Sequence, residues 1–152
     1  MGNFSERGHK RLGDILDEGA AALTALWDGR TVDHKGTITA IAVRTTPGPV
    51  QQPRIPLWFG TARTTGRPIR RAARYDGIFP LSADTGAVER IADSVRGIRG
   101  TLDGFDIAVV SRPETDLSRL AAAGATWALH AFWPGNHPEQ VLRVINRRPP
   151  SI

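Results

Sequence analysis

A regular alternation of short apolar runs with amphipathic stretches, from residue 57 onward, most constrains how this chain folds. The apolar runs predict strands at 57–59, 78–79, 105–110 and 126–132. The run at 105–110 is rich in isoleucine, alanine and valine, which is typical of a strand covered on both faces. Strands that alternate with helices predict a parallel sheet joined by right-handed crossovers.

A helix is predicted after each of these strands. Pro68 and Pro138 each suit the first turn of a helix, and Gly124 suits the end of a short one. The apolar residues of the four helices recur mostly at helical spacing. They are Ile69, Ala72 and Ala73; Val88, Ile91, Ala92, Val95, Ile98 and Leu102; Leu117, Leu120 and Ala121; and Val141, Leu142 and Ile145.

Two architectures accommodate this alternation, an open doubly wound sheet and a (β/α)₈ barrel. A complete barrel needs about 250 residues. This chain has 152 residues, which we expect to form a single domain, 1–152. It therefore has room for about half of a barrel.

The N-terminal third follows a different pattern. Apolar residues between 5 and 27 draw one helical stripe, with Ser5 suited to the N-cap and Asp28-Gly29 to the stop. Residues 31–43 predict a small β-hairpin in which His34 lies in the turn. The segment 45–56 holds four prolines and predicts an extended loop.

Charge and composition exclude several classes of function. The net charge is +5, but the basic residues are spread along the chain without a nucleic-acid-binding motif, so we expect no nucleic-acid partner. The absence of cysteine excludes disulfides and thiolate sites. No apolar run approaches the about 20 residues that span a membrane, and the N-terminal residues lack the apolar core of a secretory signal. We expect a cytoplasmic protein with no membrane partner.

The strongest candidate for a binding site is the loop Gly60-Thr61-Ala62-Arg63-Thr64-Thr65. It joins the end of a predicted strand to the start of a predicted helix, where backbone N–H groups and the helix dipole favour anions. The glycine allows close approach, the threonines supply hydroxyls, and Arg63 supplies a fork of donors. The same residues also suit a capped helix with a polar loop, so chemistry alone leaves both interpretations open.

Histidines are the other candidates for chemistry. His130 lies near the end of the last predicted strand, where it suits either an acid–base role or a structural one, because histidine exchanges protons near neutral pH. Asp14, Asp17 and Glu18 are predicted on the solvated side of the first helix, and we assign them no chemistry. No histidine pair has metal-ligand spacing with a carboxylate nearby, so we predict no metal, and the catalytic residues remain unknown.

The segment VQQPRIPLWFGTARTTGRPIRRAARYDGIFPL, residues 50–81, resembles luciferase-like monooxygenases. That family has a Pro-rich loop leading into a "P-x-W-x-x-G" strand, then an Arg/Ala-rich helix that closes on an "aromatic-Asp-Gly" turn. Upstream, GDILDEGAAALTALWDGRTVDHKG is similar to its fourth helix and insertion hairpin. Downstream, LAAAGATWALHAFWPG is similar to its seventh helix and eighth strand. The resemblance extends from about Glu6 to Pro150.

The resemblance implies an α/β fold that is a partial (β/α) TIM-type barrel, the C-terminal half. It has about four parallel strands with helices, preceded by a helix and a small β-hairpin. It also implies a flavin- or deazaflavin-dependent oxidoreductase acting on a small organic substrate. In the family the loop at 60–65 holds the flavin phosphate, and residues matching Phe79 and Pro80 lie near the flavin ring, although packing in the core also explains those two. The hydride and oxygen chemistry would belong to FMN or the deazaflavin.

By this resemblance, we expect the family's first four strands, and the glycine-rich turn after the fourth, to have no counterpart in these 152 residues. The alternative function is therefore a non-catalytic half-barrel that binds a phosphate-bearing ligand or a partner chain. A four-stranded half-barrel leaves one apolar face of its sheet uncovered, and large patches of this kind mark association. We expect a homodimer or a complex with a complementing half-barrel chain.

Overall fold

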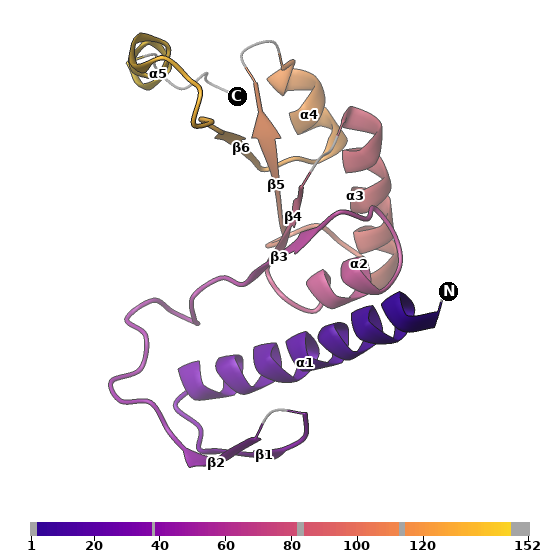
Figure 1. Ribbon diagram of the computed structural model, residues 1–152, viewed down its shortest axis with the longest axis vertical. Coiled ribbons are helices and arrows are strands. Elements are labelled where there is room, and N and C mark those ends of the chain that lie inside the picture. The colour runs from indigo at the N-terminus through magenta and orange to yellow at the C-terminus, as the bar shows by residue number, and fades with distance from the viewer. Residues whose placement is uncertain (1–2, 38, 82–83, 113–114, 147–152) are drawn as a thin grey trace. The chain divides into compact units, whose positions relative to one another are not determined.

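The computed structural model describes residues 3–37, 39–81, 84–112 and 115–146. The chain divides into two compact units, Met1–Ile55 and Pro56–Ile152. Each unit is described by itself (Figure 1). Within the described residues, no helix combines the length and apolar character that crossing a membrane requires.

The first unit consists of one long helix and a two-stranded sheet. Helix α1 runs from Asn3 to Trp27, and strands β1 (Val32–Lys35) and β2 (Thr39–Val43) pair antiparallel. The predicted helix and hairpin are thus confirmed. Two details are wrong: Ser5 lies inside α1 rather than at its N-cap, and His34 lies in β1, opposite Ala40, rather than in the turn.

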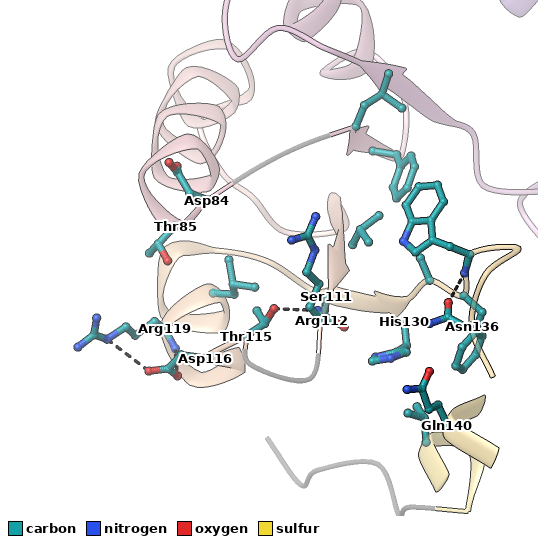
Figure 2. A pocket seen from close by; sticks show the side chains of 18 of the residues that line it. Asp84, Thr85, Ser111, Arg112, Thr115, Asp116, Arg119, His130, Asn136 and Gln140 are labelled. Carbon is teal, nitrogen blue, oxygen red and sulfur yellow. Dashed lines mark hydrogen bonds and ion pairs between the residues drawn. The ribbon is translucent and has the colours of Figure 1, made fainter. Parts of the chain in front are cut away.

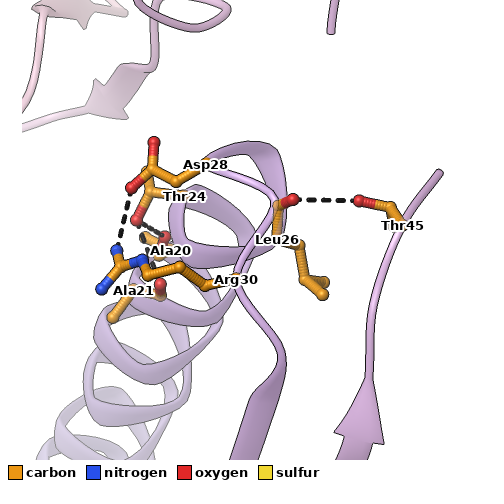
Figure 3. Close-up of polar contacts among 7 residues, drawn as sticks. All are labelled: Ala20, Ala21, Thr24, Leu26, Asp28, Arg30 and Thr45. Atoms are coloured by element: carbon orange, nitrogen blue, oxygen red, sulfur yellow. Dashed lines mark hydrogen bonds and ion pairs between the residues drawn. The ribbon is translucent and has the colours of Figure 1, made fainter. Parts of the chain in front are cut away.

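The C-terminal end of α1 is fixed by short polar contacts (Figure 3). The Thr24 hydroxyl donates to the carbonyls of Ala20 and Ala21, both at 3.0 Å. The hydroxyl of Thr45, beyond β2, donates to the Leu26 carbonyl at 3.0 Å. Gly29 has a φ of 72°, a left-handed conformation that glycine adopts without strain, and the helix ends before it as predicted.

Glu18 is the main departure from expectation in this unit. Its side chain is half-buried rather than on a solvated face. Oε2 accepts a hydrogen bond from the Thr37 backbone N–H at 2.8 Å and lies 3.3 Å from Nε2 of His34. The carboxylate therefore ties α1 to the hairpin, a structural role that helical periodicity does not reveal.

The second unit alternates strands and helices four times. The strands are β3 (Trp58–Thr61), β4 (Gly77–Pro80), β5 (Asp106–Ser111) and β6 (Trp127–His130). The helices that follow them are α2 (Arg67–Ala72), α3 (Thr85–Arg99), α4 (Leu117–Ala123) and α5 (Pro138–Ile145). All four strands are parallel, as predicted. The last strand is shorter than predicted and ends at His130, so Phe132 lies outside it.

The strand order distinguishes between the two architectures that the sequence allows. The sheet runs β3-β4-β5-β6, so each strand neighbours the next one along the chain. Helices α2, α3 and α4 lie along one side of this sheet (Figure 1). A doubly wound sheet would reverse its strand order and place helices on both sides. The observed order is that of consecutive units of a (β/α)₈ barrel.

The core lies between the sheet and these helices. Phe59, Ile78, Ile107 and Val109 lie on the buried face of their strands. The predicted apolar residues of α2 and α3 are buried with two exceptions: Ile98 is 48% exposed, and Leu102 is half-buried beyond the end of α3, which stops at Arg99 rather than reaching Leu102 as predicted. The opposite face of the sheet is less covered: Trp127 is 52% exposed and Leu129 is 38% exposed. Burial of both faces, expected at 105–110, therefore applies to the middle of β5, while Val110 is only half-buried.

Candidate functional site

A cavity of about 1290 Å³ lies at the carboxyl ends of β4, β5 and β6 (Figure 2). In α/β folds with parallel strands, ligands bind at this edge, where the loops and helix N-termini converge. The residues that line it are Phe79, Leu81, Asp84, Thr85, Val110, Ser111, Arg112, Thr115, Asp116, Arg119, Leu120, His130, Ala131, Phe132, Trp133, Asn136, Gln140, Arg143 and Val144.

The cavity has an apolar wall and a polar rim. Phe79 and Val110 come from the less covered face of the sheet, while Phe132 and Trp133 follow β6 directly. Trp133 is 68% exposed, which is unusual for so large an apolar side chain. Apolar side chains beside polar groups that can orient a ligand are the ordinary composition of a small-molecule site.

Short loops hold the polar groups in place. The Thr115 hydroxyl accepts the Arg112 backbone N–H at 2.8 Å, which closes the turn after β5. Asp84 caps α3 by accepting the Ala87 N–H at 2.7 Å, and Asp116 caps α4 by accepting the Arg119 N–H at 3.1 Å. These carboxylates stand at the N-caps because their oxygens satisfy N–H groups that the helices leave unpaired.

The predicted loop at 60–65 lies at the same edge of the sheet but does not line this cavity. Thr61 is buried, and its hydroxyl both accepts the Arg63 N–H at 2.9 Å and donates to the Arg63 carbonyl at 3.0 Å. That hydroxyl is therefore committed to the turn. Gly60, Ala62, Arg63 and Thr65 are exposed, and Thr64 is half-exposed.

The helix that follows this loop begins without a side-chain cap. Gly66 occupies the N-cap position with a φ of 86° and, as a glycine, supplies no capping side chain. A Cβ atom added at Gly66 would meet nothing within 4 Å. The space beside Gly66 is therefore compatible with the predicted anion site.

Phe79 and Pro80, the two residues of β4 predicted to lie near the flavin ring, are on opposite faces of the strand. Phe79 is half-buried and lines the cavity, whereas Pro80 is buried on the other face of the strand, opposite Thr61 in the register with β3. Beyond the strands, the Leu81 N–H donates to the Thr61 carbonyl at 2.8 Å. This bond ties the start of the loop at 60–65 to the residue that follows β4, Leu81, which lines the cavity.

His130 lines the cavity from the end of β6. It is half-buried, and its ring centroid lies 5.2 Å from that of Phe132. Its register partner is Ser111, so it shares a face with the buried side of β5. Because the imidazole of His130 lines the cavity, it is placed for an acid–base role, whereas its contact with the Phe132 ring suits a structural role. Among the described residues, no group of three potential ligands could hold a metal ion.

Sequence reasoning missed much of this cavity. Ser111 and Arg112 stand where β5 ends, and Asn136 and Gln140 belong to the loop and helix after β6. The rule that ligands bind beyond the carboxyl ends of parallel strands, which applies to His130 as a candidate, would also have indicated Ser111 and Arg112. Asn136 and Gln140 carry no such signal, because their approach to the cavity depends on the path of the chain after β6.

The family assignment follows from comparison of the whole sequence. The family model described as luciferase-like monooxygenase matches residues 1–146. The chain belongs to this family. The resemblance seen in residues 50–81 and in the flanking segments is thus confirmed. No curated protein matches the sequence at a significant level.

The fold agrees with this assignment. The structure is similar to the crystal structure of DmoA from Hyphomicrobium sulfonivorans, with a TM-score of 0.53 and 18% sequence identity. The similarity covers 67% of this chain and 27% of the DmoA chain. At this identity the comparison concerns the fold alone. It confirms the predicted α/β fold, a partial (β/α) barrel, and the chain spans only about a quarter of its structural relative.

Proposed function

We propose that this member of the luciferase-like monooxygenase family is a flavin-dependent oxidoreductase, using FMN or a deazaflavin to act on a small organic substrate. The observation that carries the proposal is the cavity at the carboxyl ends of β4, β5 and β6, in a chain that matches the family over residues 1–146. Members of this family generally use reduced flavin or deazaflavin. The bound flavin supplies the hydride and oxygen chemistry.

The described residues fit a flavin in two places. The loop at 60–65 fits a phosphate, because Arg63 and Thr65 are exposed there and the next residue, Gly66, carries no side chain that would hinder an anion. The cavity has room for an aromatic ring system, since pockets for drug-sized ligands are about 300–1,000 Å³. Both lie at one edge of the sheet, on neighbouring strands.

Each part of the chain has a distinct role in this proposal. Backbone N–H groups of the loop at 60–65, with Thr64 and Arg63, bind the phosphate. Phe79 and Leu81 form an apolar wall that excludes water from the flavin ring. The Thr61 hydroxyl positions Arg63 through its two bonds to that residue. Pro80 supports Phe79 from the buried face of β4.

Titration of the full chain with FMN and with the deazaflavin cofactor, followed by flavin fluorescence, tests the proposal. We expect one cofactor to bind, and the double variant Arg63→Ala/Thr64→Ala to bind it at least about 10-fold more weakly. Arg96→Ala is the matched control, because Arg96 lies in the last turn of α3 and pairs with exposed Asp93 at 2.8 Å. That variant should bind the cofactor as the original chain does.

Two results would count against the proposal. Binding of neither cofactor would favour the alternative function, a non-catalytic half-barrel that binds a phosphate-bearing ligand or a partner chain. Equal loss of cofactor affinity in the Arg63/Thr64 and Arg96 variants would contradict the assignment of the flavin phosphate to the loop at 60–65.

We also propose that a homodimer contact or a complementing half-barrel chain covers the open face of the sheet. One feature of that face supports this: the large apolar side chains of Trp127 and Leu129 are exposed on edge strand β6. Exposed apolar patches of this kind often mark association.

A further inference from the structure

The charged groups of the cavity are not balanced. Its lining holds three arginines and two aspartates. Each aspartate already serves as a helix cap, Asp84 for α3 and Asp116 for α4. Asp116 also pairs with the Arg119 side chain, Oδ2 to Nε at 3.3 Å. The arginines of the cavity therefore outnumber its aspartates. Both aspartates, in addition, accept hydrogen bonds from the N–H groups at the starts of α3 and α4.

Arg112 differs from the other two arginines. Arg119 is directed toward Asp116, away from the rest of the cavity (Figure 2). Arg143 Nε donates to the Glu139 carbonyl at 3.4 Å. The Arg112 guanidinium has no hydrogen-bond or ion-pair partner among the described residues. In Figure 2 it stands between Thr85 on one side and His130 on the other. The Arg112 backbone N–H donates to the Thr115 hydroxyl, and this bond positions the residue at the end of β5.

Arg112 lines the cavity together with several apolar side chains, namely Phe79, Val110, Leu120, Phe132 and Trp133. Arg112 itself is exposed, so its guanidinium is accessible to the charged group of a ligand whose apolar body contacts those residues. The planar fork of N–H donors of the guanidinium matches a carboxylate, sulfonate or phosphate group.

From this arrangement we infer that the cavity binds a small organic anion whose charged group pairs with Arg112 and whose apolar body lies against Phe132 and Trp133. The inference rests on the proposed function for one point, that this anion is the substrate rather than the cofactor. The site is separate from the phosphate loop, because Arg112 follows β5 whereas Arg63 follows β3. The cavity volume of about 1290 Å³ leaves room for both a flavin ring and a second molecule.

Isothermal titration of the full chain with octanoate and with octanol tests the inference. The two probes share an apolar tail and differ in charge. We expect octanoate to bind more tightly, and Arg112→Gln to weaken octanoate by about 10-fold or more while octanol is unchanged. Arg96→Gln is the control and should alter neither. Octanoate binding should also shift the tryptophan emission of the chain to shorter wavelength, because the apolar tail covers Trp133, and the shift should be lost in Trp133→Phe.

Several outcomes would overturn the inference. The inference that Arg112 recognises the charge of the ligand would be contradicted if octanol bound as tightly as octanoate. It would also be contradicted if Arg112→Gln left octanoate binding unchanged. Displacement of octanoate by FMN, with Arg112→Gln weakening both equally, would assign the anion to the cofactor phosphate. Octanoate binding that depends on Arg112 in a chain that binds no flavin would support the anion site while contradicting the proposed function.

Discussion

Oδ2 of Asp76 accepts a hydrogen bond from the backbone N–H of Leu57 at 2.7 Å. Asp76 belongs to the turn that ends α2 and starts β4, and Leu57 precedes β3, so this bond fixes the entry of one strand against the next. The Asp76 N–H also donates to the Leu57 carbonyl at 3.3 Å. The Tyr75-Asp76-Gly77 turn, seen in the sequence as part of a family pattern, thus has a structural function.

Asp76→Ala should therefore destabilise the chain. It leaves the Leu57 N–H without its charged acceptor, and bonds of this kind contribute about 1.5–3 kcal/mol. We expect the urea midpoint to fall by a corresponding amount. Asp93→Ala is the control: Asp93 is 76% exposed and pairs with exposed Arg96, so its loss should change stability by no more than about 1 kcal/mol. Equal effects would contradict the structural role of Asp76.

Gly77 allows Trp58 to lie across the sheet. A Cβ atom at this position would stand 2.6 Å from Cδ1 of Trp58 and 2.7 Å from the Asp106 carbonyl oxygen. Because the carbonyl cannot move without disturbing β5, Gly77→Ala should cost about 1–3 kcal/mol. Gly97→Ala, in α3 with nothing within 4 Å, should instead stabilise by about 0.5–1 kcal/mol. Thermal unfolding followed by circular dichroism should shift in opposite directions for the two variants.

Gly124 and Gly100 form a second matched pair. Both end helices with positive φ, 111° and 82° respectively. A Cβ atom at Gly124 would also lie 3.2 Å from the Cβ of Ala92, whereas one at Gly100 would meet nothing. Gly100→Ala should cost about 1–2 kcal/mol from backbone conformation alone, and Gly124→Ala should cost more. Chemical denaturation of the two variants would contradict this if Gly100→Ala proved the more harmful.

The strands and helices of the second unit were predictable because their signals are local. Pro68 and Pro138 both lie in first turns, and Gly124 adopts the left-handed conformation expected at a helix end. The order of the strands was not predictable from the alternation alone, since both candidate architectures share it. Strand order depends on which edges pair, and that was determined by the structure and agrees with the family resemblance.

The site was less predictable than the fold. Phe79 lines the cavity as expected, but the loop at 60–65 stands apart from it, and the Thr61 hydroxyl is used inside its own turn. Arg112 went unnoticed because a lone arginine after a strand resembles any surface residue. Glu18 was misplaced for a related reason: its partner Thr37 is 19 residues away, beyond the reach of helical periodicity.

The open face of the sheet gives the last prediction. Leu129 is 38% exposed on edge strand β6, and by alternation it shares the less covered face with Val110, its register partner. If a second half-barrel covers this face, the chain should be larger than a monomer in solution at micromolar concentration. Leu129→Lys should then shift the mass toward the monomer, because a charge within an apolar contact is costly to bury.

Ile98→Lys is the control for that substitution. Ile98 is 48% exposed on α3, a helix on the other side of the sheet, so a lysine there should leave the mass unchanged. Sizing with light scattering measures the mass, and circular dichroism verifies that both variants fold. An original chain that is monomeric, or a mass that responds equally to both lysines, would contradict association through this face.

A complementing chain from a separate gene would raise the measured mass only if that chain were present in the sample. The mass is therefore measured with the chain alone and again after addition of extract from its native cell. A shift in the second case that Leu129→Lys abolishes and Ile98→Lys preserves would place the complementing half-barrel on this face, because of these two residues only Leu129 lies on the side that a closed barrel would enclose.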